Sequence, residues 1–254
     1  MNDFLVLGIA YLYVVVVLLV GELLRKFFEK SSEFTRKVIH IFAGFAIYTV
    51  LFFDHPWVAN VVALTFAILL FLAGPSSPVS ALRELFGTME REEEGQKLWG
   101  PFFYAVSILT LTLIFTIGGV INPGFETFYW LATVPLTIMY LGDGLATIIG
   151  KRYAKRVYTL VGGSKRSVIG SLTLFTAGFG GSILAMWFNG ILAIEINYAP
   201  SSVILTWDVI IIIALIAAGI ATLIELFSPS GTDNLTIPLI TSPLISLIYV
   251  LIYL

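Results

Sequence analysis

Long apolar runs separated by short polar segments make up almost the whole of this chain. A helix needs about 20 mostly apolar residues to cross the hydrocarbon core of a membrane. Applied to this pattern, that length predicts eight helices, at residues 4–20, 38–53, 57–73, 101–121, 128–149, 168–187, 207–226 and 238–254. The second, third and eighth are short, so we predict an all-α, polytopic transmembrane helix bundle with seven or eight spans.

The composition agrees with a membrane protein. Hydrophobic residues make up 58% of the chain and charged residues only 12%, which is far from the balance of a soluble domain. The longest polar stretch, residues 75–100, is too short for a separate soluble domain, so residues 1–254 are expected to form a single integral membrane domain. The first apolar run follows Met1 without a basic region or a cleavage site, which favours a retained helix over a signal peptide. With no cysteine, the chain has no disulfide, thiolate nucleophile or sulfur-ligated metal.

The positive charges predict the orientation of the bundle. All fourteen lysines and arginines fall within residues 25–37, 83–97 and 151–166. With eight spans these three loops lie on one side, and the positive-inside rule makes that side cytoplasmic. The opposite loops, around Asp54, 122–126 and 189–208, contain no lysine or arginine. The short chain without targeting extensions fits a multi-pass protein of a prokaryotic plasma membrane.

A buried acid and a group of cations meet at the end of the fifth span. Asp143 is costly inside a membrane unless it is paired or binds a ligand. Gly142 and Gly144 beside it allow a ligand to approach the backbone closely. Beyond the helix end at Gly150, four cations are available to neutralise phosphate oxygens, namely Lys151, Arg152, Lys165 and Arg166. The pattern predicts a site for a metal-bound polyphosphate. The alternative is that the glycines only pack helices together and that the basic loop only sets the orientation in the membrane.

Two further polar groups are predicted on the same side. Arg36 and His40 share a helix face at the start of the second span, with Lys37 beside them, although basic residues also flank membrane helices for topological reasons. Glu225 ends the seventh span, and Asp233 with Asn234 begins the eighth. A helix cap explains Asp233 but not Glu225. The acidic run at 90–94 is typical of a solvated loop.

Hard oxygen ligands are common to these groups. Asp143, Glu225, Asp233 and Asn234 all offer oxygen atoms. Magnesium prefers carboxylates, waters and substrate phosphates, so this set suits Mg²⁺.

The blocks occur in a fixed order along the chain: Arg36-Lys37-x-x-His40, Gly142-Asp143-Gly144-x-Ala146-x-x-x-Gly150-x-Arg152, Lys165-Arg166-Ser167-x-x-Gly170-Ser171, and Glu225-x(7)-Asp233-Asn234-x-x-x-Pro238. Together they resemble the phytol kinase and dolichol kinase family of integral membrane lipid kinases, which includes CTP-dependent diacylglycerol kinases. The Gly-Pro-x-x-Tyr of residues 100–104 is similar as well, and the resemblance covers residues 35–240.

The resemblance implies transfer of the terminal phosphoryl group of CTP, or another nucleoside triphosphate, to the hydroxyl of a membrane isoprenoid alcohol such as phytol, geranylgeraniol or dolichol. It implies Mg²⁺ at Asp143, Glu225 and Asp233. The catalytic residues it implies are Asp143, His40 and Lys165, with the choice of hydroxyl partner open between Asp143 and His40. The implied nucleotide and phosphate ligands are Arg36, Lys37, Gly142, Gly144, Gly150, Arg152, Arg166, Ser167, Gly170, Ser171 and Asn234. Many relatives carry Lys-Ser in place of Lys165-Arg166-Ser167, which favours Lys165 and Ser167 over Arg166.

Other functions remain open at this level. A CTP-dependent diacylglycerol kinase and a cytidylyltransferase that makes CDP-lipid share the same nucleotide and interface chemistry. A secondary transporter is more distant, because its polar residues belong near the bilayer midplane and not at one face. The expected partners are a nucleoside triphosphate, a long-chain lipid alcohol and membrane lipids, with no nucleic acid. The sequence leaves open the lipid alcohol, the choice among CTP, UTP and ATP, and the oligomeric state.

Overall fold

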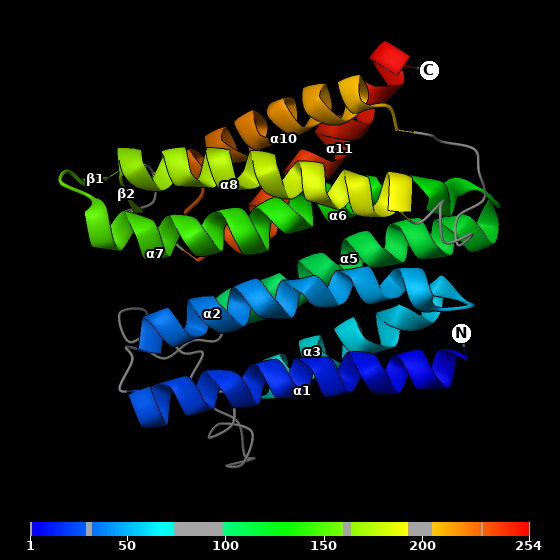
Figure 1. Ribbon diagram of the computed structural model, residues 1–254, viewed down its shortest axis with the longest axis horizontal. Helices are drawn as coiled ribbons and strands as arrows, with labels where there is room; N and C mark the ends of the chain where they lie inside the picture. The colour runs from blue at the N-terminus through cyan, green and yellow to red at the C-terminus, as the bar shows by residue number, and fades with distance from the viewer. Residues whose placement is uncertain are drawn as a thin grey trace.

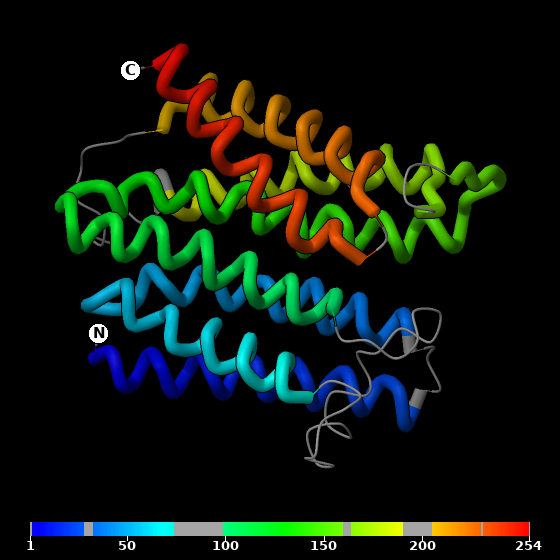
Figure 2. The backbone as a smooth tube through the Cα atoms, turned by 180° about the vertical axis from the view of Figure 1, so that it is seen from behind, coloured from blue at the N-terminus to red at the C-terminus, as the bar shows by residue number. Residues whose placement is uncertain are grey.

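Nine α-helices account for most of the described structure. The computed structural model describes residues 2–28, 32–73, 99–159, 164–192, 205–229 and 231–253. The helices are α1 (Asp3–Phe28), α2 (Ser32–Gly44), α3 (Asn60–Leu72), α5 (Trp99–Ile121), α6 (Trp130–Thr137), α7 (Gly144–Tyr153), α8 (Val168–Met186), α10 (Trp207–Phe227) and α11 (Asp233–Tyr253). They lie side by side along one direction (Figures 1 and 2), which confirms the all-α prediction.

Several helices continue through turns of different pitch. Three 3-10 segments and two π-helical segments extend or join them: Phe45–Phe52, Pro56–Ala59 and Phe125–Phe128, then Ile138–Asp143 and Trp187–Leu192. Within the described residues seven helical segments are long and apolar enough to cross a membrane, and Pro56–Leu72 is a shorter apolar helix. The seven or eight predicted spans are therefore confirmed. The second begins earlier than predicted, at Glu33 and not at residue 38, because the polar residues before Val38 continue the helix.

A short hairpin is the departure from a purely helical chain. Strand β1 (Tyr158–Thr159) pairs antiparallel with β2 (Lys165–Arg166), and Tyr158 lies opposite Arg166. Successive side chains of a strand point to opposite faces. Lys165 accordingly faces solvent, whereas the Arg166 side chain is only 15% exposed.

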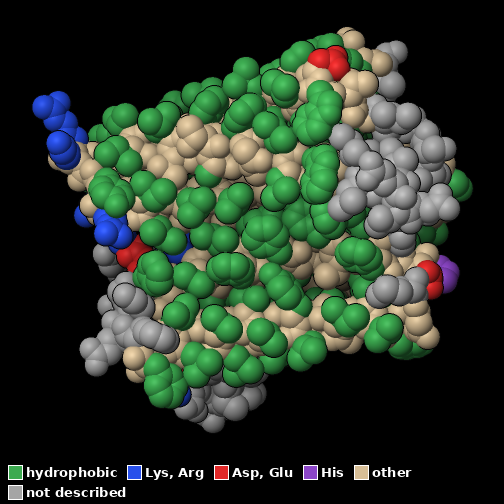
Figure 3. Space-filling model, in the orientation of Figure 1, with side chains coloured by type: hydrophobic (Ala, Val, Ile, Leu, Met, Phe, Trp, Pro, Cys, Tyr) green, Lys and Arg blue, Asp and Glu red, His purple; other side chains and the backbone are tan. Residues whose placement is uncertain are grey.

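The helix ends that carry the described lysines and arginines gather at one end of the bundle. These are the last turn of α1, the second turn of α2, the last turn of α7, and the hairpin (Figure 1). The space-filling view places its blue side chains at this same end (Figure 3). We call it the basic end. The N-terminus lies at the opposite end (Figure 1), and Asp3 close to it pairs with His55.

The helices divide into two packed groups. Helices α1, α2, α3 and α5 form what we call the N-terminal layer, with α1 against α2 and α3 against α5. Helices α6, α7, α8, α10 and α11 form the C-terminal layer, in which α8 contacts α6, α7 and α10. Contacts of α2 with α7 and of α5 with α11 join the layers. Segments from both layers meet at the basic end.

Candidate functional site

A break in helical pitch positions Asp143. Pro135 lies inside α6 and cannot donate a backbone hydrogen bond. The π-helical turn Ile138–Asp143 follows within one turn and ends on the acid. Such turns are rare and are found frequently at functional sites. A Cβ atom at Gly144 would overlap the side chain of Ile41, so the glycine lets α2 approach the acid closely.

Lys37 and Asp143 form a buried ion pair between the two layers. The Nζ atom of Lys37 lies 2.6 Å from Oδ2 of Asp143, and these side chains are 5% and 4% exposed. Buried charges are costly unless they are paired. The pair therefore fixes α2 against the end of the π-helical turn, at the basic end.

His40 lies one helical turn after Lys37, beside the same carboxylate. Its Nε2 atom is 3.7 Å from Oδ2 of Asp143 and 3.1 Å from the carbonyl oxygen of Met139. Since a carbonyl oxygen only accepts hydrogen bonds, we assign the proton of the neutral ring to Nε2. That assignment leaves Nδ1 as the atom of His40 that can accept a proton.

Tyr104 fixes His40 from the other side. Its hydroxyl donates to the backbone oxygen of His40 over 2.8 Å, and the two rings lie 4.5 Å apart. The sequence pattern at residues 100–104 pointed to this segment but did not identify Tyr104 as a site residue. The contact joins α5 to α2, which no local pattern predicts.

Arg166 turns inward toward two acids of the C-terminal layer. Its Nε atom is 2.8 Å from Oε1 of Glu225, and its Nη2 atom is 3.7 Å from Oδ2 of Asp233. Within the described structure both nitrogens are buried and have no hydrogen-bond acceptor in good geometry. Oε2 of Glu225 and Oδ1 of Asn234 are buried and lack hydrogen-bond partners in the same way. In this cluster of described side chains, two donors and two acceptors thus lack a well-aligned hydrogen bond, although the guanidinium is ion-paired with both carboxylates.

Asn234 is held in a defined orientation by α5. Its Nδ2 atom donates to the carbonyl oxygen of Gly100 over 3.0 Å, and Oγ of Ser107 donates to its backbone oxygen over 2.7 Å. The backbone N–H of Asn234 donates to Oδ1 of Asp233. Since the Gly100 carbonyl requires a donor, the amide cannot be flipped, and Oδ1 remains available as an acceptor.

The predicted glycines pack helices together. A Cβ atom at Gly150 would lie 3.3 Å from the Cα atom of Gly170, and one at Gly142 would lie 3.3 Å from the Leu174 carbonyl oxygen. Ser167 caps α8, with its hydroxyl accepting from the N–H of Gly170 over 3.1 Å. Ser171 lies within 3.3 Å of the Tyr158 hydroxyl, beside the hairpin. In the structure these contacts hold α7, α8 and β1 together.

Of the remaining predicted cations, Arg152 and Lys165 lie toward solvent, whereas the Arg36 side chain is 11% exposed and lines the apolar groove described below. The Arg152 guanidinium lies 5.4 Å from the ring centre of Tyr153. Lys151 forms an ion pair with Glu33, and Arg36 lies 3.9 Å from the same carboxylate. The acidic run at 90–94 and the glycines at 162–163 lie outside the described residues.

The carboxylates do not form one metal cluster. Within the described structure no three His, Cys, Asp or Glu side chains come close enough together to hold a metal ion. Asp143 pairs with Lys37, whereas Glu225 and Asp233 face Arg166. Mg²⁺ in phosphoryl-transfer sites is commonly bound by one or two carboxylates together with substrate phosphates. The unsatisfied oxygens of Glu225 and Asn234 fit that mode better than an all-protein cage.

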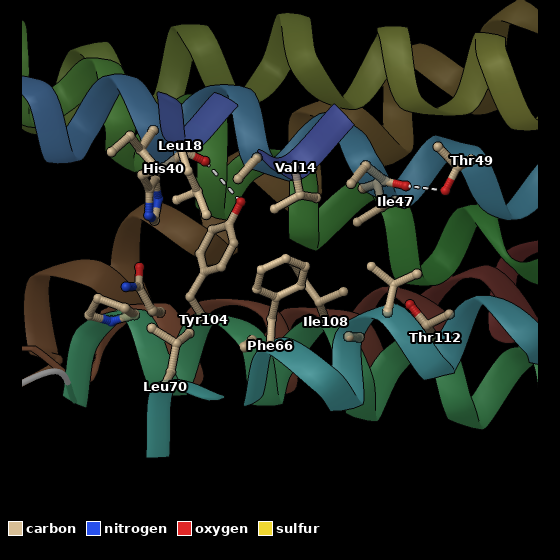
Figure 4. Close-up of a pocket in the computed structure, with 18 of the residues that line it drawn as sticks. Val14, Leu18, His40, Ile47, Thr49, Phe66, Leu70, Tyr104, Ile108 and Thr112 are labelled. Carbon is tan, nitrogen blue, oxygen red and sulfur yellow. Dashed lines mark hydrogen bonds between the residues drawn. The ribbon is translucent and has the colours of Figure 1, made fainter. Parts of the chain in front are cut away.

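An apolar groove begins at this cluster and runs into the N-terminal layer. Lys37, His40 and Asn234 line its mouth, and its walls come from α1, α2, the 3-10 segment Phe45–Phe52, α3 and α5. Figure 4 shows His40 and Tyr104 at one end of the groove, with Thr49 and Thr112 at the other. Asp143 is not among the described residues that line it. The groove thus connects a charged site at the basic end with the apolar interior.

The fold and the site together define a multi-pass membrane protein in which ionic residues meet an apolar groove. The chain is 30% identical to the phytol kinase of Synechocystis sp. over 232 residues, which is 91% of this chain and 86% of the relative. Probable chloroplastic phytol kinases of Glycine max and Oryza sativa subsp. japonica are each 27% identical, over 85% and 87% of this chain. The chain belongs to the phytol kinase family.

The plant relatives are longer, and the chain spans 65% of each of these two. No family model matches the chain, and no solved structure matches it. The similarity to the Synechocystis phytol kinase over 91% of the chain confirms the resemblance seen in the sequence blocks.

Proposed function

We propose that this protein transfers the terminal phosphoryl group of a nucleoside triphosphate, CTP by preference, to the hydroxyl of a phytol-type isoprenoid alcohol. The reaction would take place at the basic end, on the cytoplasmic face. The observation that carries this proposal is the set of unsatisfied donors and acceptors on Arg166, Glu225 and Asn234, beside the mouth of the apolar groove. A water-soluble phosphate donor and a lipid-dissolved acceptor need such a junction.

On the donor side, the polar atoms match a metal-bound polyphosphate. The buried N–H groups of Arg166 suit phosphate oxygens, because a guanidinium makes strong, charge-assisted hydrogen bonds to them. Glu225, Asp233 and Asn234 would hold Mg²⁺ together with the nucleotide phosphates. When bound, the ion supplies positive charge that offsets the charge developing on the transferred group.

On the acceptor side, His40 is better placed than Asp143 to meet the hydroxyl, because His40 lines the groove. In the proposed step, Nδ1 of His40 takes the hydroxyl proton as the alcohol oxygen bonds to the terminal phosphorus. The bond from that phosphorus to the bridging oxygen breaks, and the nucleoside diphosphate leaves. Asp143 acts as a positioning residue, since Lys37 holds its carboxylate beside the ring.

The test uses purified protein in detergent with Mg²⁺, phytol or geranylgeraniol, and terminally labelled CTP, UTP or ATP in separate reactions. We expect label in a lipid monophosphate, with the highest rate from CTP. CDP-lipid and pyrophosphate as products would indicate a cytidylyltransferase instead. Absence of transfer from every donor to phytol, geranylgeraniol, dolichol and diacylglycerol would contradict the proposal.

A further inference from the structure

We infer that the apolar groove holds the single tail of the acceptor alcohol, and that its closed inner end sets the longest tail the enzyme accepts. This inference rests on the proposed function and goes further, because it assigns the groove a ligand and a selective role. The occupant is an amphiphile with a small polar head at His40 and one unbranched or methyl-branched hydrocarbon tail.

The walls of the groove match a hydrocarbon. Beyond the mouth they consist mainly of aliphatic and aromatic side chains, such as Leu18, Ala43, Phe66 and Ile108. Ligand sites of this kind use apolar walls for the body of the ligand and a few polar groups for its orientation. Here the charged and ionisable side chains lie at one end only.

The hydroxyl groups along the groove are already satisfied. Thr49 donates to the backbone oxygen of Ala46 over 2.7 Å, and Tyr104 donates to His40. The Thr112 hydroxyl lies 3.4 Å from that of Tyr129. A water molecule inside would find few partners, and a stable buried water needs two to four. The groove therefore favours a hydrocarbon over water along its length.

The inner end is closed by buried side chains. Ile47, Val50, Ala59, Val62 and Thr112 line it and are each less than a tenth exposed. From His40 to Gly44 along α2, and on to Val50 along the 3-10 segment, the chain rises about 18 Å, which is more than half the thickness of the hydrocarbon core. A tail in the groove would thus run parallel to the neighbouring lipid chains and stop at these residues.

The first experiment fills the inner part of the groove. Ala63 lines it on α3, whereas its neighbour Leu64 is 47% exposed on the outer face. We expect Ala63→Phe to lower kcat/KM for geranylgeraniol and phytol by about tenfold, with geraniol changed by less than about twofold. Leu64→Phe adds an aromatic ring outside the groove and serves as the matched control, with no change in preference.

The outcomes separate this inference from the proposed function. If the unaltered protein phosphorylates no alcohol, the proposed function fails before the groove is tested. If it phosphorylates phytol but Ala63→Phe leaves the ratio of geraniol to phytol unchanged, the groove does not hold the tail. An equal loss for all alcohols, in a variant that elutes as a single species, would overturn the inference as well.

A second measurement does not depend on any variant. A geranylgeraniol analogue with a photoreactive group at the tail end is crosslinked to the unaltered protein, with phytol as competitor. We expect phytol-sensitive labelling of peptides from residues 45–66, or at Ile108 or Thr112 of α5, which line the inner part of the groove. Labelling confined to peptides of the C-terminal layer, or labelling that phytol does not displace, would overturn the inference.

Discussion

Lys37 and Asp143 are each almost fully buried at the basic end, so each charge depends on the other. Changing one partner alone leaves an uncompensated buried charge, which costs about 3–5 kcal/mol. We therefore expect Asp143→Asn to lower the unfolding temperature in detergent as well as to abolish phosphoryl transfer. The measurement pairs thermal unfolding with the transfer assay.

A double variant separates folding from catalysis at this pair. Lys37→Met combined with Asp143→Leu removes both charges and keeps side chains of similar size, and such replacements of buried pairs are often neutral in stability. We expect the unfolding temperature to recover while transfer stays absent. Recovery of transfer together with stability would show that the pair serves folding alone.

Arg166 and Lys165 are adjacent cations with opposite surroundings, and they provide a matched test of the nucleotide site. Arg166→Lys keeps the charge facing Glu225 but loses the planar guanidinium. We expect the KM for CTP to rise about tenfold, as charge-assisted hydrogen bonds to phosphate are lost. Lys165→Arg, on the exposed face, should change this KM by less than about twofold. Equal effects of the two changes would remove Arg166 from the nucleotide site.

At the level of residues, the sequence motifs identified charged residues that the structure brings to the basic end, but not which of them pair. Asp143 and Glu225 were identified because acids at a membrane edge are costly, and Asp233 because it adds an oxygen ligand and matches the family blocks. That Lys37 pairs with Asp143, 106 positions away, depends on how α2 packs against the π-helical turn. Which of Lys165 and Arg166 faces inward depends on the register of the hairpin. Neither the ion pair nor the inward orientation of Arg166 can be predicted from the spacing of residues within one segment.

At the scale of whole elements, the contact of α7 with α8 depends on two glycines, Gly150 and Gly170. A Cβ atom at Gly150 would press against the Gly170 backbone, which cannot yield as a flexible side chain does. We expect Gly150→Leu to destabilise the protein by about 1–3 kcal/mol through overpacking. Thermal unfolding measures this cost, and Gly180→Leu on the open face of α8 is the control, with a change below about 0.5 kcal/mol. Similar costs at the two positions would contradict the packing role.

Apolar runs predicted the spans well, because the need to satisfy every backbone group in lipid forces long helices. The finer elements were not predictable. The π-helical turn at Asp143 lies just after Pro135, and its Tyr140 packs onto Gly44 of α2, a contact that local sequence does not reveal. The hairpin is only two residues long on each strand, which is too short for an alternating pattern to appear in the sequence.

The orientation of the whole molecule can be tested because the chain has no cysteine. Lys155→Cys places a single thiol on an exposed position of the basic end, and His55→Cys places one at the opposite end. In right-side-out vesicles we expect an impermeant maleimide to label His55→Cys at once, and Lys155→Cys only after the membrane is opened. The reverse pattern would place the basic end outside the cell.

For the molecule as a whole, the number of spans and the clustering of positive charge were readable from the sequence. The groove was not. It forms where Val14, Ala63 and Ile108 approach one another from α1, α3 and α5, and each of these residues looks like an ordinary lipid-facing position in its own helix. Only the packed structure distinguishes a wall of the groove from the outer surface.

Under the proposed function, the two-layer construction would hold most of the acceptor tail apart from the nucleotide. The groove lies within the N-terminal layer, whereas Arg166, Glu225 and Asp233 belong to the hairpin and the C-terminal layer. Most residues of either group can therefore change without contact with the other, except where the layers meet at the Lys37–Asp143 pair and at Asn234. Under the proposed function, acceptor choice can diverge between homologues while the donor site is kept, and exchange of groove-lining residues of α1, α3 and α5 offers a rational route to enzymes with new lipid preferences.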